Sequence, residues 1–230
     1  MPPVSLDAAS AQTVRDAVAL HVAFALVALA TLALPAPDLG WRLLGLVTLY
    51  SVALPLVGRW RGHREWAQLW GFLALVSVFQ VGPDAFLASI LGTLHFPDTG
   101  GPRLGSTPLA MAGMWTIPLW VSLFTARQLD RGDRRRGTWI AALVCGLVLV
   151  SSEATLWAVP IWEATGGVTR VGRVAVYVIA PEVLLGAVAY FAYMNTRDQS
   201  WTIKGAAAGL VSLVYLGALC ASYGLMERVF

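Results

Sequence analysis

Long runs of apolar residues, separated by short polar segments, organise the whole chain. A helix needs about 20 mostly apolar residues to cross a bilayer, and seven runs approach or exceed that length. They cover residues 14–34, 40–57, 66–81, 107–126, 138–161, 171–194 and 204–226. The pattern predicts an all-α fold: a polytopic integral membrane protein in which residues 1–230 form one domain, a bundle of seven transmembrane helices.

One further apolar stretch, residues 84–94, is too short to span a membrane. It follows Gly82-Pro83. We expect it either to extend the third helix past a proline kink or to lie as a re-entrant or interfacial helix. In the second case Asp84 would serve as the N-cap of that segment.

Charge orients the predicted bundle. Of the 16 Lys and Arg residues, eleven lie near the N-terminus and in the loops after the second, fourth and sixth spans. The positive-inside rule then places the N-terminus in the cytoplasm and the C-terminus outside. With 57% hydrophobic and 13% charged residues, the chain has too little charge for a nucleic-acid-binding protein or an ordinary soluble enzyme. We expect the lipid bilayer as a partner and no nucleic acid. The Ala- and Arg-rich composition, with one lysine, favours a bacterial inner membrane.

Three acids lie inside or beside the predicted spans. Glu153 is in the fifth span, Glu182 near the middle of the sixth, and Asp84 near the outer end of the third. Ionisable residues in a membrane are costly and mark functional sites by default. A carboxyl in an apolar site favours its protonated form and is then available as a general acid. We expect the three to converge on one cavity and name them as candidate catalytic residues. A purely structural hydrogen-bonding role for each remains the alternative.

Aromatic and soft side chains near these acids suggest what they act on. Trp157 follows Glu153 by four residues and Tyr190 follows Glu182 by eight, spacings that favour a shared helical face. Ring faces stabilise carbocations, and methionine supplies an adaptable apolar wall. The candidate substrate-binding residues are Trp115, Trp157, Tyr177, Tyr190, Met111, His95, Asp98 and Trp162.

His95 and Asp98 belong to a loop rich in glycine and proline. This loop is expected to form a lid or a polar head-group site, or else a tight exposed turn. His95 and Asp98 alone are too few ligands for a metal centre. Cys145 and Cys220 lie in separate apolar runs, and we expect each to be a small buried apolar side chain. We therefore expect no metal site at these residues.

The chain resembles the small seven-helix integral-membrane terpene cyclases of the meroterpenoid type, with membrane carotenoid cyclases and hydratases as a neighbouring group. The Pro181-Glu182 pair is similar to the Pro-x-Glu motif of small membrane lycopene cyclases, but here the acid follows the proline directly and no second acid stands beside it. The resemblance implies a non-redox, acid-initiated cyclisation of a prenylated or isoprenoid lipophilic substrate, without a cofactor.

Other classes of seven-span protein fit less well. A retinal protein needs a lysine in the middle of the last span, whereas Lys204 stands at its start. A paired haem site needs two histidines, and His21 is the only one inside a span. A small proton-coupled carrier, with Glu153 and Glu182 as a proton relay, remains the alternative from a non-enzyme class. The substrate, the identity of the proton donor and self-association into a homo-oligomer stay open.

Overall fold

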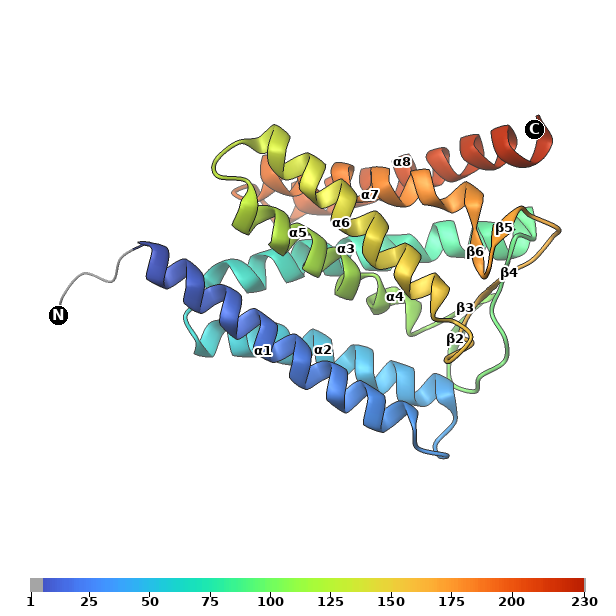
Figure 1. The fold of residues 1–230 in the computed structure, drawn as a ribbon, viewed down its shortest axis with the longest axis horizontal. Helices are drawn as coiled ribbons and strands as arrows, with labels where there is room; N and C mark the ends of the chain where they lie inside the picture. Colours follow the sequence, from blue (N-terminus) through green and yellow to red (C-terminus); the bar gives the residue numbers. More distant parts are fainter. Residues whose placement is uncertain (1–5, 230) are drawn as a thin grey trace.

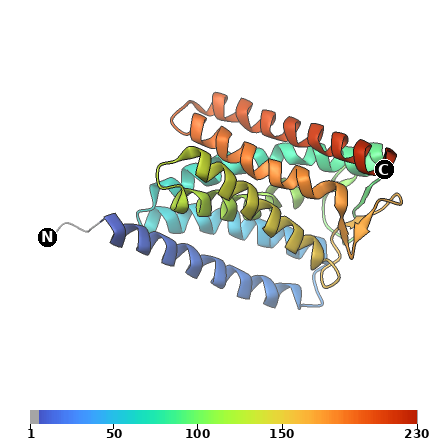
Figure 2. The same ribbon diagram turned by 45° about the horizontal axis from the view of Figure 1, so that its top comes forward.

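The computed structural model describes residues 6–229, which form an all-helical bundle (Figure 1). The long helices run roughly along one direction, and Figure 2 shows the same arrangement turned by 45° about the horizontal axis. The helices are α1 (Leu6–Leu32), α2 (Leu39–Trp60), α3 (Arg64–Phe86), the π-helical turn η1 (Leu87–Leu91), α4 (Met111–Met114), α5 (Thr116–Leu129), α6 (Arg134–Ala154), α7 (Val176–Thr196) and α8 (Trp201–Arg228).

Short strand pairs gather at one end of the bundle, which we call the hairpin end (Figure 1). They are β1 (Leu94–His95) with β4 (Glu163–Ala164), β2 (Arg103–Leu104) with β3 (Thr107–Pro108), and β5 (Arg170–Val171) with β6 (Val174–Ala175), all antiparallel. The first pair joins two connections that are far apart in the sequence. The opposite end carries the connections at residues 61–63, 130–133 and 197–200 and is called the Arg-rich end.

Six helices within the described residues are long and apolar enough to cross a membrane: α1, α2, α3 with η1, α6, α7 and α8. The predicted fourth span, residues 107–126, is not one continuous helix. It consists of β3, the short α4 and the 14-residue α5, with a break at Trp115. Pro118 has no N–H to bond the carbonyl of Met114, which interrupts the ladder at that turn.

The predicted fifth and sixth spans are longer than the helices that replace them. α6 ends at Ala154 rather than at residue 161, and α7 begins at Val176 rather than at residue 171. Between them the chain forms turns and strands. Pro160 disfavours a helical conformation in the residue before it, and Gly166 and Gly167 have positive φ angles that leave the helical region.

The segment at residues 84–94 extends the third helix. α3 continues through Pro83 and Asp84 to Phe86, and η1 carries the helical path on to Leu91. Gly92, with a φ of 65°, ends it. Asp84 therefore lies inside a helix, and its assignment as an N-cap is wrong.

The ends of the described chain lie on opposite sides of the bundle. α1 begins at the Arg-rich end and α8 finishes at the hairpin end (Figure 1). The three connections that sequence analysis grouped by their arginines, around residues 61–63, 130–133 and 197–200, all lie at the Arg-rich end.

An aromatic cluster fills the bundle beside the Arg-rich end. Trp120 stacks between His21, at 5.1 Å between ring centroids, and Phe124, at 4.5 Å. Trp66 meets Trp120 edge-on at 5.3 Å, and the Nε2 atom of His21 lies 3.1 Å from the Tyr50 hydroxyl oxygen. Trp120 and Phe124 lie about one and two turns further along α5 than Trp115.

Candidate functional site

A cavity of about 510 Å³ opens within the bundle toward the hairpin end. Its wall comes from α1, α2, α3, α4, α5, α6, α7 and α8, together with the connections that carry β1, β4 and β6. Most of the lining is apolar. This volume is within the range of sites that hold drug-sized ligands.

The three candidate acids lie in the wall of this one cavity. Asp84 comes from α3, Glu153 from the last turn of α6, and Glu182 from α7. Asp84 is 4% exposed and Glu182 3% exposed, while Glu153 is half-buried. Each sits on a helix that other helices hold in place, so the three carboxyl groups have defined positions.

Asp84 is held by an aromatic donor. The indole Nε1–H of Trp115 donates to Oδ2 of Asp84 over 3.0 Å. The break between α4 and α5 places Trp115 at this point, and its ring meets the ring of Tyr215 edge-on at 5.8 Å between centroids. A hydrogen bond from an N–H stabilises the carboxylate form of an acid.

Glu153 and Glu182 lie in the same cavity wall and have different surroundings from Asp84. Within the described residues, the buried Oε2 atom of each has no hydrogen-bond partner. The two groups are close enough for their charges to repel, and Glu153 also faces the backbone of Ala175 and the indole of Trp162. Two neighbouring carboxyl groups without a counter-charge favour a state in which at least one holds a proton.

No ion pair among residues 6–229 involves any of these three acids. Arg173, at the turn between β5 and β6, lines the mouth of the cavity without reaching them. An uncompensated acid in an apolar environment is costly.

Four of the predicted substrate-binding residues line the cavity, namely Met111, Trp115, Trp162 and Tyr177. The Tyr177 hydroxyl donates to Oγ1 of Thr93 over 2.9 Å and fixes its ring in the wall. Together with Tyr215 and the apolar residues of α1 and α2, these side chains give the cavity a mixed aromatic and aliphatic surface.

The other four predicted substrate-binding residues lie elsewhere. α6 ends before Trp157, which therefore leaves the face of Glu153 and is 71% exposed. Tyr190 points to the Arg-rich end, where its hydroxyl donates to Asp130 over 2.7 Å. His95 is exposed on β1, and Asp98 accepts from the backbone N–H of Gly100 over 3.1 Å, which closes an exposed turn. The turn alternative for this loop is the one that the structure supports.

Sequence reasoning missed several residues of the wall. Tyr215, which is 4% exposed, lies near Glu182, Asp84 and Glu153; its hydroxyl in the middle of a predicted span was a usable signal. Arg173 and Thr93 lie in loops whose path the sequence does not reveal. The apolar side chains of α1 look like any other lipid-facing residues, so no pattern marked them.

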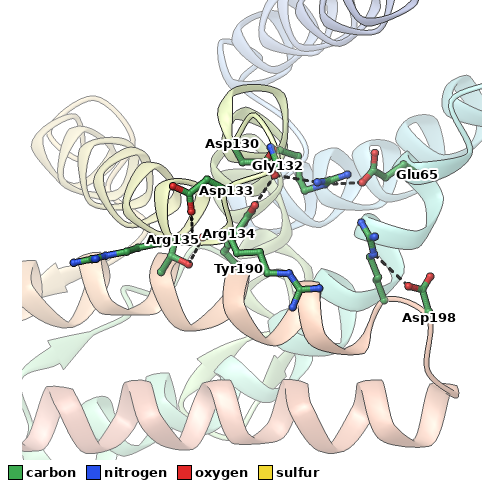
Figure 3. A network of polar contacts seen from close by, with 11 residues as sticks. Glu65, Asp130, Gly132, Asp133, Arg134, Arg135, Tyr190 and Asp198 are labelled. Carbon is green, nitrogen blue, oxygen red and sulfur yellow. Dashed lines mark hydrogen bonds and ion pairs between the residues drawn. The ribbon is translucent and has the colours of Figure 1, made fainter. Parts of the chain in front are cut away.

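A different polar network holds the Arg-rich end (Figure 3). Arg127 donates to Glu65 over 2.8 Å and to Asp130 over 3.0 Å, which connects α3, α5 and the following loop. Asp130 also accepts from the Gly132 N–H and from Tyr190 of α7. Burial acts to raise the pKa of Asp130, but these donors and the Arg127 charge outweigh it and lower that pKa below its usual value.

Asp133 belongs to the same end and caps α6. Its Oδ1 accepts from the backbone N–H groups of Arg135 and Arg136, as an N-cap aspartate does. Nearby, Asp16 pairs with Arg61 at 2.9 Å and with His63 at 2.8 Å. The acids of this end thus have donors or cations beside them.

The described residues contain no group of three or more His, Cys, Asp or Glu side chains arranged to hold a metal ion. Cys145 is buried and Cys220 half-buried, and both are free thiols. The chemistry that the cavity offers with its own residues is proton donation, proton acceptance and shelter from water.

Comparison with known proteins gives one family. A family model described as "Domain of unknown function (DUF6989)" matches residues 81–226, well over half of the chain. The matched region contains Asp84, Glu153 and Glu182, whereas α1, α2 and most of α3 lie before it. No curated protein and no solved structure matches the chain.

Proposed function

The chain belongs to the DUF6989 family, and we propose that it is an integral-membrane terpene cyclase. Its reaction would be a non-redox cyclisation of a prenylated or isoprenoid lipophilic substrate, started by protonation of a terminal alkene or epoxide. One observation carries this proposal: three carboxyl groups from three helices share a single apolar, aromatic-lined cavity and have no cationic partner there.

The proposed setting is a bundle that crosses the membrane seven times, with α4 and α5 together as the fourth pass. An odd number of passes agrees with the first turn of α1 and the end of α8 lying on opposite sides. The arginines gathered at one end support a cytoplasmic location for that end. The cavity would then open toward the outer half of a bacterial inner membrane.

The reaction would begin at the Glu153–Glu182 pair. One of these carboxyl groups, in its acid form, gives its proton to the substrate, and its O–H bond breaks. At an alkene the π electron pair forms the new C–H bond and leaves a carbocation at the other carbon. At an epoxide the oxygen takes the proton, and a ring C–O bond breaks to leave a hydroxyl group and a carbocation. The glutamate becomes a carboxylate. A positioned acid of this kind contributes about 10² to 10⁴-fold to a rate.

The wall would then guide the cation. The faces of Trp115, Tyr177 and Tyr215 supply electron density that stabilises positive charge, and the apolar walls from α1 and α2 keep water from capturing it. The aromatic cluster around Trp120 closes the cavity toward the Arg-rich end, so bulk water has no direct route from that side.

Asp84 would end the reaction. Its carboxylate, held by the Trp115 N–H at 3.0 Å, takes a proton from a carbon beside the final cation, and the C–H electron pair becomes the new double bond. One proton has entered and one has left, so the product is an isomer of the substrate. Different surroundings for acid and base within one site are the usual way to separate these roles.

The test uses the purified chain in liposomes with a linear prenylated phenol or its terminal epoxide, analysed by chromatography and mass spectrometry. Cyclic products of unchanged mass are expected. Glu153→Gln and Glu182→Gln should each reduce their formation strongly. Glu163→Gln, which changes an exposed acid on β4 outside the cavity, is the matched control and should retain activity.

Other results of the same experiment would indicate other functions. A product that has gained one water would indicate a hydratase of the carotenoid type. Proton-driven solute uptake into the liposomes without any cyclic product would favour the carrier. Full activity in both glutamine variants would refute the mechanism proposed here.

A further inference from the structure

The cavity wall has two parts with different chemistry. Every polar side chain that lines the cavity, from Asp84 to Tyr215, lies within the region matched by the family model. The wall before that region is entirely apolar. It comprises Phe24, Ala28, Leu29 and Leu32 of α1, and Leu43, Leu46 and Val47 of α2.

The α1 residues form a stripe along one face of the helix. Phe24, Ala28 and Leu32 are spaced four residues apart, so they follow one another along the cavity. Ala28 is the smallest of them and leaves room between its two larger neighbours. A wall of this kind offers no hydrogen bond and no charge, so it can discriminate between ligands only by their size and shape.

Polar contacts fix α1 at both ends and leave its middle largely uncovered. Near its start, Asp16 binds Arg61 and His63. At its end, the Arg42 guanidinium donates to the carbonyl of Leu32 over 2.7 Å. Between these points Phe24 packs against Tyr50 at 5.0 Å between ring centroids, whereas residues on the opposite face, including Ala23, are exposed, and only a small share of the helix is buried. Ala28 and Leu32, further along the stripe, are therefore held in position without being part of the buried core.

α2 is anchored much more tightly. A Cβ atom added at Gly113 would lie 2.5 Å from Cγ1 of Val47, and one added at Gly58 would lie 2.8 Å from Cβ of Trp66. Such close backbone approaches leave little freedom to reshape α2. Of the two helices, α1 can change its cavity-facing side chains with the smaller disturbance to the fold.

We propose that α1 is the element that sets the length of the isoprenoid chain the cavity accepts, with Ala28 as the principal determinant. This inference rests on the proposed function for the class of ligand, but it concerns binding and not catalysis. The acids within residues 81–226 transfer the protons, and the apolar face of α1, outside that region, limits the length of the chain that fits.

The experiment measures binding without turnover. Tryptophan fluorescence reports ligand entry because Trp115 and Trp162 line the cavity. The full chain in liposomes is titrated with phenols that carry prenyl chains of increasing length. Ala28→Phe should reduce affinity for the longest ligand by about tenfold or more, a usual effect of a few methylene groups in an apolar pocket, and leave the shortest nearly unchanged. Leu32→Ala should shift the preference toward longer chains.

Ala23→Phe is the matched control, since it makes the same substitution at an exposed position of α1 that lies about 140° around the helix from Ala28. It should leave every affinity unchanged. Equal losses in Ala23→Phe and Ala28→Phe, or a loss in Ala28→Phe that is the same for all lengths, would overturn the inference. So would the absence of binding to the unaltered chain. A shift in length preference without any cyclic product would keep the inference and reject the cyclase, so the two failures are distinguishable.

Discussion

The acids of the Arg-rich end and the two glutamates of the cavity have opposite surroundings. At the Arg-rich end, Asp130 receives hydrogen bonds from Arg127, Gly132 and Tyr190, and Asp16 pairs with Arg61 and His63. Toward the hairpin end, Glu153 and Glu182 each keep a buried oxygen without any partner. The aspartates of the Arg-rich end have cations or hydrogen-bond donors beside them. The two glutamates of the cavity each keep a carboxyl oxygen that is not used in any such contact within the described residues.

This difference separates structural acids from candidate catalytic ones. A paired acid gains its stability from its partner, and breaking the pair leaves a buried charge uncompensated. An unpaired acid in an apolar cavity lowers stability as it stands. Substitutions of the two kinds of acid should therefore change stability and activity in opposite ways, and four experiments test this.

The largest effect is expected at the unpaired glutamates. Glu182→Gln keeps the shape of the side chain but cannot donate an acidic proton, so the rate of cyclic product formation should fall by about 10²-fold or more. The free energy of unfolding should stay level or rise, because a neutral amide replaces an acid. A large loss of stability together with activity would place Glu182 among the structural acids.

Arg127→Met should behave in the reverse manner. It leaves Glu65 without its partner and deprives Asp130 of a donor, so the free energy of unfolding should fall by about 2 kcal/mol, measured by denaturation in detergent. Arg135→Met is the control, because this exposed guanidinium forms no ion pair in the described part of the chain. Equal stability of the two variants would show that the network at the Arg-rich end contributes little.

Trp115→Phe tests the role assigned to Asp84. The ring remains in the wall but the N–H donor is lost, so the carboxylate form of Asp84 loses a hydrogen bond. We expect a rate loss of about tenfold, equivalent to about 1.4 kcal/mol, with ligand affinity nearly unchanged. Trp157→Phe, at an exposed position outside the cavity, should have no effect. A change in affinity alone would indicate that Trp115 only packs against the ligand.

The smallest effect concerns pH. The pKa of Asp130 is lowered in the folded chain, so its contribution to stability is present above the usual carboxyl value of 3.8 and is lost as the pH falls through the lowered folded value. The thermal midpoint should therefore drop on strong acidification. Asp130→Asn should start from a lower midpoint and lose less of it over the same interval. Parallel curves for the two proteins would contradict this assignment.

Much of the fold was predictable because apolar length is a local signal. The spans at residues 14–34, 40–57 and 204–226 correspond to α1, α2 and α8. The predicted fourth span was wrong as a continuous helix because Pro118 breaks it at Trp115. The fifth and sixth were too long, since hydropathy alone does not separate a helix end from an apolar turn.

The candidate site was predictable only in its charged members. Asp84, Glu153 and Glu182 stood out because acids are rare in apolar runs. Trp157 and Tyr190 were misplaced, since a shared helical face extends no further than the helix and says nothing about depth along the bundle axis. Tyr215 and the stripe on α1 were missed because packing between distant helices brings them to the cavity.

The all-helical architecture, the clustering of arginine at one end and the identity of the costly acids can all be read from the sequence, because each follows from the composition of short segments. The packing of the helices determines which acids have partners, that three of them share one cavity, and that α1 forms part of its wall. These features depend on contacts between residues far apart in the chain. No local pattern encodes such distances, which are set by how the helices pack.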